Sequence, residues 1–166
     1  MHYAVIFLPL LGAIICYFGK FLGNFFSQFI SCLFIIISSI LSLIIFFRGI
    51  NYNDYGNFVL FNWISSGNFQ ANWSINIDPL SSVMLVVVTV VSALVHVYSL
   101  GYMSHDPHKP RFMSYLSLFT FSMLSLVVSD NFLQLFFGWE GVGLCSYLLI
   151  GFWYKKENAN NAAIKA

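Results

Sequence analysis

The sequence predicts an all-α membrane protein of about five transmembrane helices, with an external β-hairpin between the second and third. Of the 166 residues, 59% are hydrophobic and 8% are charged, whereas soluble domains carry about a quarter charged residues. Apolar runs long enough to cross a hydrocarbon core of about 30 Å as helices recur along the chain. A single long connection alternates between apolar and polar residues, as a half-buried strand does.

Five apolar runs are the predicted spans. They are Tyr3–Leu22, Phe29–Phe47, Pro79–Tyr102, Phe112–Val128 and Phe132–Tyr154, of which the fourth is the shortest. The first run has no preceding basic residue and no small-residue cleavage pattern, so we expect it to remain in the mature protein. The chain then divides into two helices over 1–48, an external hairpin loop over 49–78, and three helices with a short inner tail over 79–166.

The distribution of cations predicts the orientation, because Lys and Arg in short loops stay on the cytoplasmic side. One side of the five-helix path carries only Arg48. We therefore expect the amino terminus outside and the carboxyl terminus inside a bacterial inner membrane or, alternatively, a mitochondrial inner membrane. The cations on the other side are Lys20, Lys109, Arg111, Lys155, Lys156 and Lys165.

The connection from Gly49 to Asp78 predicts the hairpin. Phe58–Ile64 is rich in strand-forming residues, and Ser65–Asn68 supplies turn residues. The apolar face of the second strand could pack on the ends of the chain's own helices or on a neighbouring subunit, and the sequence leaves both open. That face carries Phe69, Ala71, Trp73, Ile75 and Ile77, alternating with Gln70, Asn72, Ser74, Asn76 and Asp78.

Two acidic positions have the pattern of helix caps. Asp78 stands directly before Pro79 at the start of the third helix, in the order that helix starts favour. Asp130 and Asn131 precede the fifth helix in the same way. We expect capping roles for these residues, with transport chemistry as the alternative for Asp130 and Asn131.

Charge and motif content exclude several classes of function. Seven Lys or Arg against six Asp or Glu give a formal charge of +1, so we expect no nucleic-acid partner. Cys16, Cys32 and Cys145 lie in apolar runs without metal-ligand spacing, and we expect them to be small buried apolar residues. No phosphate-binding loop or nucleotide fingerprint occurs, so we expect no bound metal, no bound cofactor and no redox chemistry on this chain.

Glu140 is the main candidate site residue. It lies eight residues after Phe132, or about 12 Å along the helix, which places it near the middle of a 30 Å core. An unpaired charge there costs about 2.5 to 3.5 kcal/mol, so the carboxyl group needs a partner or a proton. Both conditions suit a proton carrier, and we predict proton translocation over the alternative of a purely structural buried acid.

Small residues surround Glu140 on the fifth helix. Gly138, Gly141 and Cys145 form one face, which indicates close packing against another helix or a thin region that admits water beside the carboxyl group. The second face contains Glu140, Gly143, Leu144, Tyr147 and Gly151.

His96 is the second candidate, six residues before Tyr102 and about 9 Å from the inner end of the third span. Because imidazole titrates near neutral pH, it could relay protons between the inner surface and Glu140. It could equally be a neutral ring that hydrogen-bonds a hydroxyl or carbonyl group of a neighbouring helix.

The stretch from Gly138 to Tyr154, which reads GWEGVGLCSYLLIGFWY, strongly resembles the subunit L family of NADH-quinone oxidoreductase, called chain 5 in mitochondria. Supporting matches are Ile77–Ser81, His96–Met103 and Asn161–Ala166, so the resemblance extends over nearly the whole chain. Sodium/proton antiporter relatives share part of the motif. The resemblance implies the N-terminal part of an antiporter-like fold.

The resemblance also implies a role in coupling quinone reduction to proton translocation, with other membrane subunits of complex I, protons and the lipid bilayer as partners. Glu140 matches the family's key glutamate and His96 a family histidine. The NADH, FMN, iron–sulfur and quinone sites of the complex belong to other subunits.

Family members carry further helices, including one with a lysine opposite the glutamate. We therefore expect this chain to be a fragment that does not pump alone. The alternatives are a subunit of an Mrp-type sodium/proton antiporter and a truncated remnant without transport.

Overall fold

The computed structural model describes residues 1–18, 23–67 and 69–165. This described part contains six helices and one two-stranded sheet. The elements are α1 (His2–Phe18), α2 (Asn24–Tyr52), β1 (Gly56–Ser66), β2 (Phe69–Ile77), α3 (Pro79–Tyr102), α4 (Lys109–Val127), α5 (Phe132–Ile150) and α6 (Glu157–Lys165). The mostly helical architecture and a two-stranded hairpin between the second and third long helices are thus as predicted.

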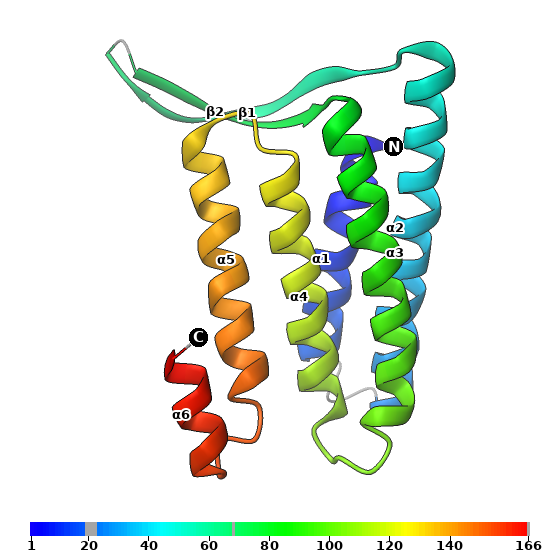
Figure 1. The fold of residues 1–166 in the computed structure, drawn as a ribbon, viewed down its shortest axis with the longest axis vertical. Helices are drawn as coiled ribbons and strands as arrows, with labels where there is room; N and C mark the ends of the chain where they lie inside the picture. The colour runs from blue at the N-terminus through cyan, green and yellow to red at the C-terminus, as the bar shows by residue number, and fades with distance from the viewer. Residues whose placement is uncertain (19–22, 68, 166) are drawn as a thin grey trace.

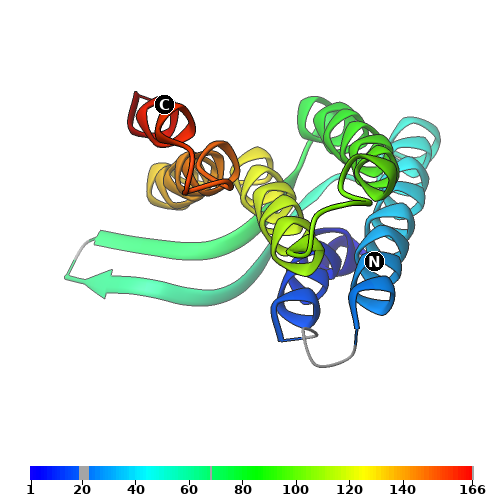
Figure 2. The same cartoon turned by 90° about the horizontal axis from the view of Figure 1, so that it is seen from below.

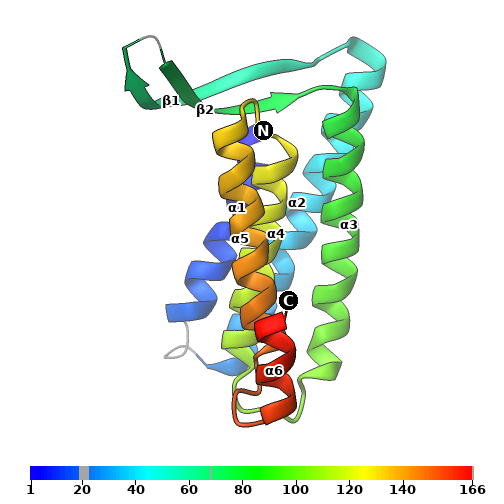
Figure 3. The same ribbon diagram turned by 60° about the vertical axis from the view of Figure 1, so that its left-hand side comes forward.

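The five long helices run alongside one another, and α4 lies at their centre (Figure 1). Viewed from below, α1, α2 and α3 surround one side of α4, while α5 covers the other side (Figure 2). The short helix α6 packs against α5 at the end of the bundle opposite the hairpin (Figure 3).

Three of the described helices are long and apolar enough to cross a membrane, namely Phe25–Tyr52 of α2 together with α3 and α5. The helix α1 is apolar but shorter, at 17 residues. The helix α4 has Lys109 and Arg111 in its first turn and several hydroxyl residues along its length, and all of these lower its mean hydropathy. Those hydroxyl groups are mostly buried because α4 is the central helix.

The polarity of the bundle is the reverse of that of a soluble protein. Ser38, Ser42 and Thr89 are fully buried between helices, whereas Val91 and Leu94 on the outer side of α3 are 54% and 66% exposed. Small hydroxyl residues allow close helix contacts and hydrogen bonds in a lipid environment, where an apolar outer surface is favourable. The burial pattern therefore agrees with a lipid solvent.

The hairpin lies across the ends of the helices near the amino terminus (Figure 1, Figure 3). Its strands are antiparallel, and Gly56 pairs with Ile77 at the open end. Ile75 and Ile77 are buried in a core that also contains Val5 and Leu124. The apolar face of β2 thus packs on the chain's own helices near its base. Phe69, at the far end, is 54% exposed.

Both predicted helix caps are present: Asp78 caps α3, and Asn131, not Asp130, caps α5. The carboxylate of Asp78 accepts a hydrogen bond from the Ser81 N–H at 2.6 Å, and the Ser81 hydroxyl accepts from the Asp78 N–H at 2.8 Å. Asn131 caps α5 by accepting from the Gln134 N–H at 2.9 Å. The carboxylate of Asp130 instead accepts from the Ser74 hydroxyl at 3.3 Å, which ties the hairpin to the helix start.

Several predicted boundaries were wrong. The helix α2 continues past residue 48 to Tyr52 and ends at Asn53 in a left-handed conformation. Arg48 pairs with Asp54 at 3.1 Å across this end. The helix α5 ends at Ile150, and the predicted inner tail forms α6, which is held by buried Ala163. The predictions for Lys20, Leu22 and Asn68 lie outside the described residues.

Candidate functional site

His96 is fully buried between α3 and α4 and belongs to a chain of hydrogen bonds. Its Nδ1 lies 2.8 Å from the Ser92 carbonyl oxygen, one turn earlier in α3. Its Nε2 lies 3.1 Å from the Ser117 hydroxyl of α4, and that hydroxyl lies 2.7 Å from the Ser31 hydroxyl of α2. One imidazole therefore links three helices in the interior of the bundle.

The carbonyl partner fixes the tautomer of a neutral His96. A carbonyl oxygen only accepts, so Nδ1 carries the hydrogen and Nε2 is the acceptor. The Ser117 hydroxyl then donates to Nε2 and accepts from Ser31. If the ring gains a proton, Nε2 donates instead and the hydroxyl groups can reverse. The arrangement can thus hold a proton without losing its hydrogen bonds.

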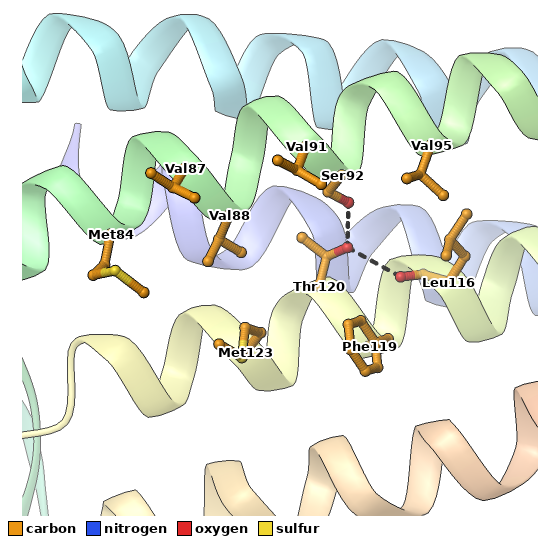
Figure 4. Close-up of a pocket in the computed structure, with 10 residues that line it drawn as sticks. All are labelled: Met84, Val87, Val88, Val91, Ser92, Val95, Leu116, Phe119, Thr120 and Met123. Carbon is orange, nitrogen blue, oxygen red and sulfur yellow. Dashed lines mark hydrogen bonds between the residues drawn. The ribbon is translucent and has the colours of Figure 1, made fainter.

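A second hydroxyl pair joins the same two helices. The Thr120 hydroxyl donates to the Leu116 carbonyl oxygen at 3.0 Å, so it accepts from the Ser92 hydroxyl at 2.5 Å (Figure 4). These groups lie at the base of a groove of about 340 Å³ between α3 and α4. The remaining side chains in Figure 4 are apolar, so the hydroxyl pair is the polar exception at this face.

Glu140 lies on the exposed face of α5 and lines a groove of about 690 Å³ between α4 and α5. Trp63 of the hairpin also lines this groove. Within the described part of the chain, its carboxyl group makes no hydrogen bond and no ion pair. The neighbouring polar side chain is Ser122 of α4. The other lining residues are Leu118, Phe121, Phe136, Phe137, Gly141, Leu144 and Cys145.

The structure does not bring His96 and Glu140 into contact. His96 belongs to α3 and Glu140 to α5, and α4 lies between these two helices (Figure 2). His96 bonds Ser117, whereas the Glu140 groove is lined by Leu118 and Ser122 of the same helix. Successive residues of a helix point about 100° apart, so these groups occupy different faces of α4. Any exchange of protons between the two residues must pass around or through α4.

The small-residue face of α5 is a packing surface. A Cβ atom at Gly138 would lie 2.7 Å from the Leu126 backbone nitrogen, and one at Gly141 would lie 2.8 Å from the Ser122 hydroxyl. Cys145 is buried beside them. Gly143 has open space around it. The close-packing interpretation of Gly138, Gly141 and Cys145 is therefore confirmed.

The sequence analysis allowed a hydroxyl or carbonyl partner for His96 but did not identify the residues of its hydrogen-bond chain. Ser31, Ser92 and Ser117 lie inside apolar runs, where each could have been a simple packing residue. The available signal was the repetition of hydroxyl residues along the predicted fourth helix, at Ser114, Ser117, Thr120, Ser122 and Ser125. The three cysteines are buried and free, as expected.

Comparison with known structures defines the class of the fold. The chain superimposes with a TM-score of 0.82 on a subunit of the membrane-bound sulfane sulfur reductase, an archaeal respiratory membrane complex. The match covers 99% of this chain and 33% of that chain, at 16% sequence identity, so it shows the fold alone. The chain therefore shares its fold with one membrane subunit of a respiratory complex.

Sequence comparisons identify the family. Residues 63–113 match the model described as NADH-ubiquinone oxidoreductase (complex I), chain 5 N-terminus, and residues 129–166 match the model described as NADH:quinone oxidoreductase/Mrp antiporter, transmembrane region. The chain is 55% identical to chain 5 of Phytophthora infestans and 56% identical to subunit L of Rickettsia conorii, over 98% of its length in both cases.

The chain therefore belongs to the chain 5 or subunit L family of antiporter-like membrane subunits, as the resemblance predicted. It spans about a quarter of the length of these relatives, 24% of the Phytophthora protein and 25% of the Rickettsia protein.

Proposed function

We propose that the chain serves in a proton-pumping NADH:quinone oxidoreductase and that Glu140 carries protons there. The observation that supports this most is the position of Glu140, midway along a helix apolar enough to span a membrane. A carboxylate at that depth is stable only when it is protonated, paired or hydrated. The groove between α4 and α5 offers a place for such a partner.

We propose that a polypeptide segment outside the described residues supplies the partner, because the described residues around Glu140 leave its carboxyl group unpaired. A cation brought into the groove would lower the proton affinity of Glu140, and its withdrawal would raise that affinity. Such alternation is the physical basis of a proton-loading site. The lysine implied by the family resemblance has the required chemistry.

His96 is the proposed relay residue. Its ring and the hydroxyl groups of Ser117 and Ser31 form a continuous chain in which donor and acceptor roles can reverse. This supports a proton path between α2, α3 and α4. We propose that water, or side chains that cover α4, complete the path from there to Glu140. The redox cofactors and quinone are proposed to lie on other subunits.

All five long helices are proposed to cross the membrane, with the amino terminus and hairpin outside and α6 inside. The support is that α1 and α4 run alongside three helices of spanning length. Lys109 and Arg111 lie in the first turn of α4, and Lys155 lies between α5 and α6. These parts of the chain are at the end of the bundle opposite the hairpin (Figure 1). A bacterial inner membrane is the proposed location, with the mitochondrial inner membrane as the alternative.

Replacement of Glu140 by Gln in the assembled complex tests the proposal. The amide keeps the shape but cannot exchange a proton, so proton pumping per NADH oxidised should fall toward the background leak. Pumping is measured by the quenching of a pH-sensitive dye in membrane vesicles. Glu157→Gln is the matched control, because Glu157 is an exposed acid in the first turn of α6. Full pumping by a normally assembled Glu140→Gln complex would refute the proposal.

Replacement of His96 by Gln distinguishes relay from structure. Glutamine can hydrogen-bond but cannot titrate near neutral pH, so a relay predicts slower pumping at an unchanged amount of assembled complex. The pumping rate is measured by vesicle acidification, and the amount of assembled complex by native gel electrophoresis. A variant that pumps at the normal rate would leave His96 a structural residue only.

The second candidate is a subunit of a sodium/proton antiporter, because the model that matches residues 129–166 also describes Mrp antiporters. Sodium-driven proton movement without NADH dehydrogenase subunits would favour it. Copurification with those subunits, and pumping that is independent of sodium, would favour the first candidate.

A further inference from the structure

A cavity of about 220 Å³ lies where the start of α4, the end of α5 and the start of α6 meet. Its polar lining comes from Arg111, Tyr115, Tyr147, Tyr154 and Asn160. It is separate from the Glu140 groove and has none of its lining residues in common with it. The transport proposal assigns no role to this cavity.

Arg111 is the cationic group of the cavity, and most of its hydrogen-bonding capacity is unused. Its Nη2 donates to the Phe152 carbonyl oxygen at 3.0 Å. Its Nε is buried and has no partner in the described structure. A guanidinium group has five N–H donors, and a buried unpaired donor costs about 1 to 3 kcal/mol. The site thus holds a buried donor that a ligand could satisfy.

Aromatic rings hold the guanidinium group in place. Its carbon atom lies 4.5 Å from the centre of the Phe152 ring and 5.6 Å from that of Tyr154. Stacking on rings covers the flat faces of a guanidinium group and leaves its edge for hydrogen bonds. Arg111 is therefore positioned before any ligand arrives.

The electrostatics favour an anion. No described carboxylate lies within ion-pair distance of Arg111, and the described lining contains no acidic residue. Asp106, whose charge acts on Arg111 only from beyond ion-pair distance, accepts a hydrogen bond from the Trp153 indole at 3.0 Å, and Glu157 lies in the first turn of α6. Lys156, over the Trp153 ring at 5.1 Å, adds positive charge to the same end of the bundle.

We propose that this cavity binds a phosphate group through the free edge of Arg111. Guanidinium groups bind phosphate oxygens with paired, charge-assisted hydrogen bonds, and the neighbouring tyrosine hydroxyl groups can donate to the remaining oxygens. The phosphate can come from an anionic phospholipid or from free phosphate. The position at the helix ends, where lipid headgroups lie, suits the phospholipid.

The full 166-residue chain in detergent tests this by native mass spectrometry. The probes are dioleoyl-phosphatidylglycerol and dioleoylglycerol, which has the same acyl chains without phosphate. The chain should retain the phospholipid and release the dioleoylglycerol. Arg111→Gln should weaken retention about tenfold or more, as the loss of about 1.4 kcal/mol does. Lys155→Gln, which removes an exposed cation at the same end, should change it less than about twofold.

Inorganic phosphate separates the two sources. If it displaces the phospholipid at equal concentration, the site is one for free phosphate. If it does not, the site is one for the lipid headgroup. Equal retention of phosphatidylglycerol and dioleoylglycerol, or unchanged retention by Arg111→Gln, would overturn the proposal.

Hydrogen exchange of the unmodified chain tests the proposal even if the Arg111→Gln variant does not fold. Amide exchange in α6 should slow with phosphatidylglycerol or with phosphate, and not with dioleoylglycerol. An absence of any such difference would also overturn the proposal, whatever the variant does.

Discussion

Several buried polar residues between the helices of this protein are held by specific partners. His96 satisfies both ring nitrogens with groups that the fold brings from α3 and α4. Ser38 donates to the Val5 carbonyl oxygen at 2.6 Å, and Ser42 pairs with Thr89 at 2.7 Å. Because an unpaired polar group in a lipid-embedded bundle is costly, each such pair favours one arrangement of the helices.

Asp78 yields a prediction for stability and its dependence on pH. The Ser81 N–H donates to the carboxylate and lowers the pKa of Asp78 below its ordinary value of 3.8. A carboxyl group with a lowered folded-state pKa stabilises the fold above its unfolded pKa, and this contribution is lost as the pH falls through the folded pKa. Asp78→Ala should therefore lower the free energy of unfolding by about 1 kcal/mol at pH 7.

Denaturant unfolding in detergent at pH 7 and at about pH 3 measures this effect. The difference between the unmodified chain and Asp78→Ala should shrink at the lower pH, and solvent screening keeps it modest because Asp78 is largely exposed. An equal difference at both pH values would mean that the carboxylate charge does not contribute to the cap.

At the scale of helices and strands, the sequence predicted which elements form but not where each one ends. The five long helices and the hairpin were located from hydropathy and alternation. The ends of α2 and α5 were not, because tertiary contacts such as the Arg48–Asp54 pair decide where a helix stops. The helix α6 has a polar sequence, and it is the burial of Ala163 against α5 that fixes its position.

Gly138→Ala and Gly143→Ala form a matched pair on one helix. The first adds a methyl group 2.7 Å from the Leu126 backbone, which cannot move without separating α4 from α5. It should destabilise the chain by about 1 to 3 kcal/mol. The second meets nothing within 4 Å, so it should be neutral or stabilising by up to about 1 kcal/mol.

Unfolding curves in detergent compare the two glycine variants. Similar curves for both variants would show that the α4–α5 contact is looser than the structure indicates.

The whole molecule has a testable arrangement across the membrane. Ser66 is the last residue of β1, His105 lies in the loop between α3 and α4, and both are exposed. The hairpin and the loop between α3 and α4 are at opposite ends of the bundle (Figure 1). The native cysteines are buried. In intact cells, a membrane-impermeant maleimide should label Ser66→Cys, whereas His105→Cys should react only after the membrane is opened.

The opposite pattern of maleimide labelling would refute the proposed orientation. Labelling of both positions from one side would refute the proposal that α3, the helix between them, crosses the membrane.

The sequence by itself determined that the protein belongs in a lipid environment, the approximate positions of the helices, the hairpin and the family. These depend on local hydropathy, alternation and motif. The sequence also identified Glu140 and His96 as candidate site residues, because ionisable side chains are rare within apolar helices of spanning length. Only the tertiary structure decided that His96 bonds Ser117 and that Glu140 faces a groove on another side of α4. Residues far apart in sequence meet through helix packing, which side-chain volume and hydrogen-bond partners decide jointly across several helices.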